Sequence, residues 1–128
     1  MTGKIVIVTG ASSGIGKAAA ALFAQNGATV IAVGRNEKEL VALQDSLGSQ
    51  RENVKLHLAD VNEYSQIDRM VSETVQAFGK IDVLVNSAGI IKNGTIENTT
   101  LDEWDKMMNV NLRSVFYLMQ KCIPHMIE

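Results

Sequence analysis

The stretch IVIVTGASSGIG, residues 5–16, decides the fold. Its first four residues are β-branched and uncharged, which is typical of a strand that is buried on both faces of a parallel sheet. The glycine-rich segment 9–16 follows at once, and from Ile15 the apolar residues take on a helical spacing that lasts until Asn26 and Gly27, a good helix stop. The stretch therefore predicts a buried strand that turns sharply into a helix.

The same alternation continues along the chain. Three more short apolar runs predict strands, and two more segments with helical spacing predict helices. The predicted strands cover 29–33, 54–58 and 81–85, and the predicted helices cover 40–47 and 67–78. A longer helix is expected to begin near Asp102, which would be its N-cap. Repeated strand–helix units imply parallel strands joined by right-handed crossovers, so we expect an α/β, doubly wound fold with helices on both faces of the sheet.

The bulk composition is that of one small globular domain. The chain has 128 residues, of which 46% are hydrophobic and 20% charged. The net charge of −2, without a cluster of Lys or Arg, argues against a nucleic-acid partner. The single cysteine, Cys122, cannot form an internal disulfide, and no leader peptide or membrane-spanning apolar run is present. We therefore expect a cytoplasmic protein with no membrane partner. His57 and His125 lack the neighbours that would indicate a metal site.

The glycine loop has the spacing G-x-x-x-G-x-G, which differs from the common G-x-G-x-x-G fingerprint of dinucleotide sites. The physical argument is the same for both. The first amides of a helix lack partners and favour an anion such as pyrophosphate, and glycine lets the backbone approach it. Gly10, Gly14 and Gly16 would serve in this way, while Ser12 and Ser13 add hydroxyl donors. The alternative is a tight turn whose glycines only permit close packing.

Four motifs, each at or after a predicted strand end, carry a resemblance to a known family. They are TGASSGIG at 9–16, Ala-Asp-Val at 59–61, NSAG at 86–89 and NVNL at 109–112. In this order they resemble the short-chain dehydrogenases/reductases, and the resemblance covers the whole chain. It implies a Rossmann-type parallel sheet with strand order 3-2-1-4. Residues 1–128 would then be a single NAD(P)-binding domain, incomplete at the C-terminus because it stops before the fifth strand of the family.

The resemblance assigns binding roles near the first and third strands. The three glycines, together with Ile15, would hold the pyrophosphate and the nicotinamide-side ribose. Asp60 would place its carboxylate against the adenine amino group, with the Val61 amide nearby. The alternative for Asp60 is a turn or N-cap residue before the helix at 67–78.

The resemblance also assigns roles after the fourth strand. Asn86 would brace the sheet, and Ala88 and Gly89 would lie beside the cofactor ribose; the family usually has N-N-A-G, so the Ser at position 87 is a mild departure. The alternative is a plain strand-ending turn. Asn111 matches the active-site asparagine, which holds a water in the proton relay; otherwise it is a polar residue that bends the long helix.

The residues after the second strand indicate which cofactor is preferred. NAD-preferring members end this strand with an acid, whereas this sequence has Gly34 followed by Arg35 and Asn36. A guanidinium binds a 2′-phosphate through charge-assisted contacts, so NADP(H) is favoured over NAD. Arg35 could instead be a solvated residue that opens the next helix. Lys17 could assist or be solvated.

The chemistry of the family also needs a Ser and a Tyr-x-x-x-Lys pair, which lie beyond the asparagine. The chain ends at Glu128, 17 residues past Asn111. Tyr117 and Lys121 have the correct mutual spacing, but they lie in the same helix as Asn111 without a preceding Ser. We therefore interpret them as surface or interface residues and expect the chain alone to be inactive.

Two functions remain open at this point. The first is an NADP(H)-dependent oxidoreductase that moves a hydride between nicotinamide and a carbonyl/alcohol substrate, with this chain as its cofactor-binding half. The second is a non-catalytic NADP(H)-binding module. The resemblance implies a small-molecule substrate of unknown identity and homo-oligomerisation through the last helix. Residues 90–101 are expected to line one side of the substrate pocket, and the strand at 81–85 to leave an apolar edge that makes the isolated chain marginally stable or self-associating.

Overall fold

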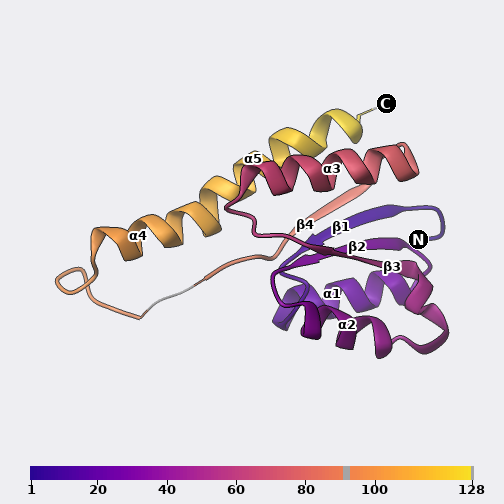
Figure 1. Ribbon diagram of the computed structural model, residues 1–128, viewed down its shortest axis with the longest axis horizontal. Coiled ribbons are helices and arrows are strands. Elements are labelled where there is room, and N and C mark those ends of the chain that lie inside the picture. Colours follow the sequence, from indigo (N-terminus) through magenta and orange to yellow (C-terminus); the bar gives the residue numbers. More distant parts are fainter. Residues whose placement is uncertain (91–92, 128) are drawn as a thin grey trace.

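The computed structural model describes residues 1–90 and 93–127 and contains a four-stranded parallel sheet. The strands are β1 (Ile5–Thr9), β2 (Thr29–Gly34), β3 (Val54–Leu58) and β4 (Val83–Asn86). They lie in the order β3-β2-β1-β4 (Figure 1), which confirms the predicted order 3-2-1-4. All five residues of β1 are buried because this strand lies between β2 and β4 with helices on both sides.

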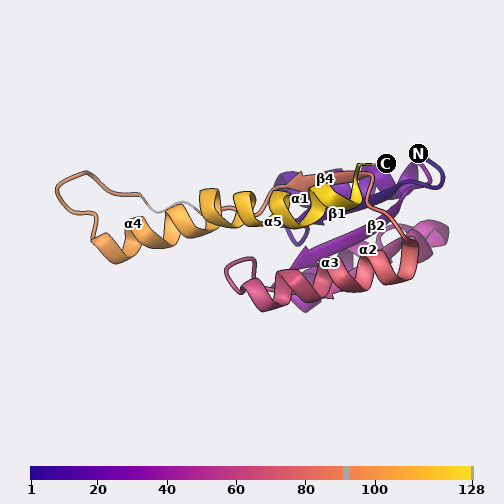
Figure 2. The same cartoon turned by 90° about the horizontal axis from the view of Figure 1, so that it is seen from above.

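Helices cover both faces of the sheet, as the alternating sequence pattern predicts. Figure 1 shows α1 and α2 on one side of the strands and α3 and α5 on the other. The helices are α1 (Gly14–Gln25), α2 (Glu37–Asp45), α3 (Tyr64–Phe78), α4 (Leu101–Met108) and α5 (Ser114–Cys122), with 3₁₀ turns at Gly48–Asn53 and Ile123–His125 and a π-helical turn at Asn109–Arg113. Figures 1 and 2 both show α4 extending beyond the end of the sheet. Within the described part of the chain, no helix combines the length and the apolar character that a membrane crossing requires.

Two apolar clusters, one on each face of the sheet, form the core. The cluster under α1 and α2 contains Val6, Val8, Val30, Ala20 and Leu40 among its buried members. The cluster under α3 and α5 is built around Ile7, Ile31, Val33, Ile67, Met70 and Leu118. Successive residues of β1 alternate between the two clusters, because side chains alternate between the faces of a strand. The continuous run of β-branched residues in β1 therefore contributes apolar side chains to the core on both faces of the sheet.

Several predicted boundaries are wrong by a few residues. The fourth strand begins at Val83 rather than at buried Ile81, whose amide donates to His125 O (3.1 Å), and it ends at Asn86. Helix α2 begins at Glu37, three residues before the first leucine of its apolar stripe. Side-chain periodicity shows which residues face the core, so it misses the polar first turn of α2 and includes Ile81, which is buried outside the strand.

The last helical region differs most from its prediction. Helix α4 begins at Leu101, and its N-cap is Thr100 rather than Asp102: the Thr100 hydroxyl accepts from Glu103 N (3.2 Å) and the Glu103 carboxylate accepts from Thr100 N (3.2 Å). This is a capping box, which satisfies two amides at once. The region is also not one regular helix, because the π turn separates α4 from α5.

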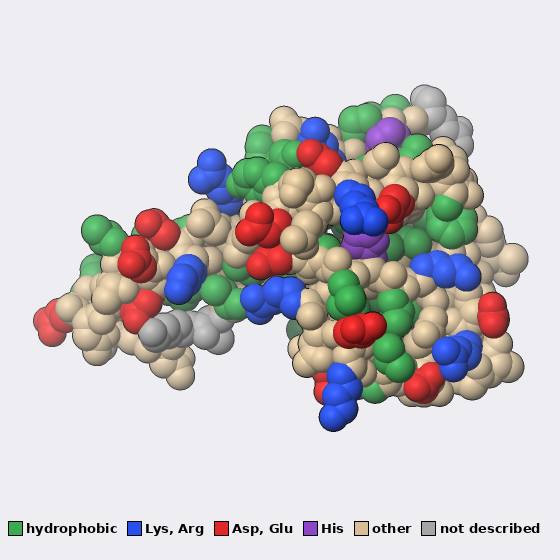
Figure 3. All heavy atoms as spheres, viewed as in Figure 1, with side chains coloured by type: hydrophobic (Ala, Val, Ile, Leu, Met, Phe, Trp, Pro, Cys, Tyr) green, Lys and Arg blue, Asp and Glu red, His purple; other side chains and the backbone are tan. Residues whose placement is uncertain are grey.

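The charged side chains are mixed in sign. On the face shown in Figure 3, Lys and Arg side chains are interspersed with Asp and Glu rather than gathered into one patch. This distribution agrees with the small net charge of −2.

Candidate functional site

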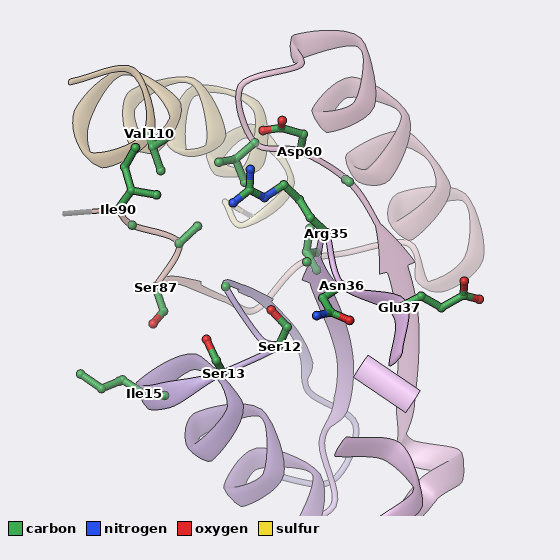
Figure 4. Close-up of a pocket in the computed structure, with 18 of the residues that line it drawn as sticks. Ser12, Ser13, Ile15, Arg35, Asn36, Glu37, Asp60, Ser87, Ile90 and Val110 are labelled. Atoms are coloured by element: carbon green, nitrogen blue, oxygen red, sulfur yellow. The ribbon is translucent and has the colours of Figure 1, made fainter. Parts of the chain in front are cut away.

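A cavity of about 970 Å³ opens at the carboxyl ends of the strands. Figure 4 shows that its walls come from the turn after β1, the start of α2, the turn after β3 and the segment after β4. These turns meet because the carboxyl ends of parallel strands share one edge of the sheet, which is where ligands bind in open α/β folds. The lining residues are Gly10, Ser12–Ile15, Val33–Lys38, Ala59–Val61, Ser87–Ile90 and Val110.

The glycine loop forms the wall at the start of α1. Gly10 and Gly14 have φ angles of +65° and +56°, which residues with a side chain rarely adopt. A Cβ atom on Gly10 would also lie 2.6 Å from Ser87 O, so the loop and the end of β4 are in direct backbone contact. The N-cap residue Ser13 makes no side-chain bond to the helix, which leaves the first amides of α1 available to an anion.

Gly16 serves packing rather than the cavity wall. It is buried in the first turn of α1, and a Cβ atom there would overlap the carbonyl oxygen of Gly10. Gly16 was predicted to touch the cofactor, but it does not line the cavity. Its absent side chain lets α1 start directly against the loop.

Thr9 joins the end of β1 to the turn after β4, a role that its sequence context does not predict. Its hydroxyl oxygen accepts from the amides of Ser87 (3.2 Å) and Ala88 (3.3 Å) and donates to Val85 O (3.4 Å). The threonine is 1% exposed, so these bonds are shielded from water. The only sequence signal was its position directly before the first glycine.

Asn86 is the last residue of β4 and lies opposite Thr9 in the sheet. It was predicted to brace the sheet and is among the predicted cofactor-binding residues, yet it does not line the cavity. Its buried Oδ1 has no hydrogen-bond partner within residues 1–90 and 93–127.

Asn111 lies in the π turn and holds the segment that follows β4. Its Oδ1 accepts from Ile90 N (2.8 Å) and its Nδ2 donates to Ile90 O (2.7 Å). The asparagine does not line the cavity, but Ile90 and the adjacent Val110 do. A π turn adds a residue to a helix and is frequent at functional sites; here it lies beside the cavity wall. Of the predicted pocket segment 90–101, only Ile90 lines the cavity among the described residues, and residues 91–92 lie outside that description.

Both signs of charge line the cavity: Arg35, Glu37 and Lys38 come after β2, and Asp60 comes after β3. Arg35 is exposed, and its guanidinium points into the cavity in Figure 4, whereas the carboxylate of Glu37 points away. The Oδ1 of Asn36 accepts from Glu39 N (3.2 Å), so this side chain caps α2. Lys17 Nζ lies 3.9 Å from Glu39 Oε2 and does not line the cavity.

Asp60 and Val61 line the cavity after β3, as predicted. The Asp60 carboxylate accepts from Asn62 N (2.9 Å), while its own amide donates to Gln66 Oε1 (2.8 Å). The N-cap of α3 is Glu63. The Asp60 carboxylate therefore stabilises the turn before α3 at a position that lines the cavity.

The Tyr117–Lys121 pair lies away from the cavity, between α5 and α3. The Tyr117 hydroxyl donates to Asp68 Oδ1 (2.7 Å), and its ring stacks on Tyr64 with 4.4 Å between centroids. Lys121 Nζ lies 3.7 Å from the same carboxylate oxygen. The hydrogen bond to Asp68 raises the pKa of Tyr117, the opposite of what a catalytic tyrosine requires.

The comparisons with known proteins agree with this geometry. The sequence profile described as short chain dehydrogenase matches residues 4–128. The chain belongs to the short-chain dehydrogenase family. It is 41% identical over 128 residues to the 3-oxoacyl-[acyl-carrier-protein] reductase FabG of Thermotoga maritima, covering all of this chain and 52% of the relative. An uncharacterized oxidoreductase of Staphylococcus aureus is 38% identical, again over the whole chain and 54% of the relative.

Solved short-chain dehydrogenase structures share the fold. A metagenomic short-chain oxidoreductase in complex with NADP superimposes with a TM-score of 0.92 at 31% identity, covering 98% of this chain and 57% of that one. A short-chain dehydrogenase/reductase from Caenorhabditis elegans with cofactor gives a TM-score of 0.90 at 36% identity over 98% and 49%. The chain thus spans about half the length of the short-chain dehydrogenases that it matches.

Proposed function

We propose that this chain is the cofactor-binding half of an NADP(H)-dependent oxidoreductase that acts on a carbonyl/alcohol substrate. The observation that carries the proposal is the cavity at the strand ends. There the uncapped start of α1 and the guanidinium of Arg35 face the same space, and no acid ends β2. The start of α1 and the Arg35 guanidinium each favour an anionic group, so together they favour a ligand with two separate anionic groups, such as a dinucleotide with an extra phosphate.

The residues of the cavity fit such a dinucleotide. The amides at Ser13–Ile15 would bind the pyrophosphate, and Gly14, whose Cβ position lies in open space, leaves their approach free of a side chain. Arg35 would bind the 2′-phosphate, with Asn36 beside it, and Asp60 and Val61 would contact the adenine. Ala88 and Gly89 would lie along the ribose, in a segment that Thr9 and Asn111 hold in place. When bound, the nicotinamide supplies the hydride donor or acceptor.

The rest of the reaction is proposed for a longer protein. In this proposal the proton donor is a Tyr-x-x-x-Lys pair with a Ser beyond Glu128, because the Tyr117–Lys121 pair is held against α3. Asn111 would then contribute to the proton relay. The alternative, a non-catalytic NADP(H)-binding module, would bind the same dinucleotide without turnover. A Ser followed by Tyr-x-x-x-Lys in the coding sequence after Glu128 supports the enzyme, and its absence supports the module.

Nucleotide titration tests the proposal directly. NADPH should bind saturably and more tightly than NADH. The change Arg35→Gln should weaken NADPH binding roughly 10- to 100-fold, because it removes charge-assisted hydrogen bonds, and should change NADH binding little. Arg51→Gln is the matched control, since Arg51 pairs with Asp45 (2.9 Å) outside the cavity. No saturable NADPH binding by the folded protein would refute the proposal, and tighter NADH binding would refute its NADP(H) part.

We also propose that the last helix forms a homo-oligomeric interface. A stripe that runs from the π turn through α5 to the last 3₁₀ turn exposes Leu112 (61%), Phe116 (61%), Met119 (40%) and Ile123 (46%). These residues are spaced by three or four and form one apolar face, which water disfavours. Sedimentation should show a dimer or larger species that Phe116→Ser dissociates, while Leu22→Ser on exposed α1 should not. A monomer at all concentrations would refute the interface.

A further inference from the structure

The helical region that carries Asn111 changes its hydrogen-bond register at one point, and Ser114 lies at that point. The amide of Ser114 donates to Asn109 O, five residues earlier, so this turn is π-helical. At the end of α4 the register is still that of an α-helix, since Asn109 N donates to Asp105 O, and it is α-helical again in α5. Because an isolated π turn is rare, the contacts at this point decide whether it forms.

The side chain of Ser114 makes the hydrogen bond that its own amide does not make. Its hydroxyl donates to Val110 O, four residues earlier, at 2.5 Å. In an α-helix this carbonyl would accept from the Ser114 amide. Ser114 is 1% exposed and Val110 is 8% exposed, so water does not replace the hydroxyl easily. Without the hydroxyl, the Val110 carbonyl would lose this donor, and the α-helical bond from the Ser114 amide would be the direct substitute.

The register decides where Asn111 lies. A change of register by one residue turns one part of a helix relative to the other by about 100°. Leu118 and Cys122 of α5 are 1% and 0% exposed and anchor that part in the core, whereas none of the eight described residues of α4 is buried. If the π turn became α-helical, the α4 part would therefore turn, and Asn111 would turn with it.

The contact of Asn111 with the cavity wall depends on this register, because burial does not hold its side chain. Asn111 is exposed, yet its amide group makes both the 2.8 Å bond from Ile90 N and the 2.7 Å bond to Ile90 O. A Cβ atom on Gly89 would lie 3.2 Å from the same Oδ1, so the approach is close. Ile90 and Val110 both line the cavity (Figure 4). A change of register would therefore alter the wall of the cavity.

We propose that Ser114 is a positioning residue: its hydroxyl holds the π turn, and the π turn presents Asn111 to Ile90 at the cavity wall. Ser114 itself does not line the cavity. The part of this inference that concerns a ligand rests on the proposed NADP(H) site. The contact between Asn111 and Ile90 does not depend on a ligand and can be measured in the free protein.

Amide hydrogen exchange followed by NMR tests the inference at single residues. Ser114→Ala should speed exchange at Ile90 roughly tenfold, because the bond from Ile90 N to Asn111 is lost. Asn111→Ala should have the same effect, and the double variant should add nothing further. The matched control is Thr74→Val: Thr74 is 4% exposed, and its hydroxyl makes the same kind of bond, to Met70 O (2.8 Å), within α3. This control should leave exchange at Ile90 unchanged.

Three results would overturn the inference. The first is an Ile90 amide that is already unprotected in the wild type, which would mean that Asn111 does not hold it. The second is exchange at Ile90 that Ser114→Ala leaves as slow as in the wild type or speeds no more than Thr74→Val does. The third is a similar loss of protection at all slowly exchanging amides in Ser114→Ala, which would show a general loss of stability in place of a positioning role.

NADPH titration of the same variants separates this inference from the proposed function. Ser114→Ala, Asn111→Ala and the double variant should lose affinity equally, and Thr74→Val should lose none. If the wild type binds no NADPH, the proposed function fails, while exchange at Ile90 still decides whether Ser114 positions Asn111. If Ser114→Ala speeds exchange at Ile90 but leaves NADPH affinity unchanged, the proposed function stands and the role of Ser114 toward the ligand is overturned.

Discussion

The change Gly10→Ala should be strongly destabilising, because two independent costs act at this position. A φ of +65° costs a residue with a side chain about 1–2 kcal/mol. The new methyl would also lie 2.6 Å from Ser87 O, a backbone atom that cannot rotate away, and overpacking of this kind costs about 1–3 kcal/mol. The free energy of unfolding should therefore fall by about 2–5 kcal/mol.

Two neighbouring glycines separate these costs. Gly14 has a φ of +56° but open space around its Cβ position, so Gly14→Ala should lose only about 1–2 kcal/mol. Gly16 has no positive φ, but its methyl would overlap Gly10 O, so Gly16→Ala should lose stability through the contact alone. Urea denaturation of the three variants measures the differences from the midpoint and slope. If Gly10→Ala and Gly14→Ala have the same unfolding free energy, the contact with the end of β4 contributes nothing and the reasoning is wrong.

Three further outcomes follow from contacts outside the loop. Burial lowers the pKa of His57 below 6.5 despite the nearby Glu73, so the unfolded chain binds a proton more readily than the folded chain, and stability should fall as the pH drops below 6.5. The denaturation midpoint should fall less with pH for His57→Gln than for the wild type, and parallel curves would contradict this. Thr9→Val should cost about 1–3 kcal/mol by leaving two amides unpaired, whereas Thr9→Ser should recover most of it in the same urea assay. Tyr117→Phe removes the bond to Asp68 and should leave nucleotide affinity unchanged in a fluorescence titration, a result that a catalytic or cavity role would not give.

The sequence predicts the sheet well because its signals are local. The β-branched runs and the glycine loop fix which segments are strands and where each turns into a helix, and the family resemblance supplies the strand order. Most predicted cofactor residues line the cavity because they lie at strand ends, where topology alone brings them together. Their roles toward a nucleotide remain predictions.

The features that the sequence did not reveal are contacts between distant segments. Thr9 accepts from amides 78 and 79 positions away, and Asn111 bonds a residue 21 positions before it. Contacts between such distant residues do not change the local spacing of apolar residues, so the sequence pattern does not reveal them. The sequence also does not reveal the π turn, because apolar residues continue on both sides of it and the pattern therefore predicts one regular helix. Motif membership alone does not show that Gly16 and Asn86 lie outside the cavity lining, and their predicted roles toward a nucleotide stay predictions.

The central position of β1 has a consequence for how the binding site comes into being. Its neighbour β2 follows after one short helix, but its other neighbour β4 arrives more than 70 residues later along the chain. Pairing across that separation closes a long loop, which is slow compared with local pairing. The cavity therefore stays open on one side until the last strand docks. A nucleotide that contacts all four walls of the cavity would bind only molecules in which β4 has docked. Its binding would therefore stabilise the completed fold over the partly folded one.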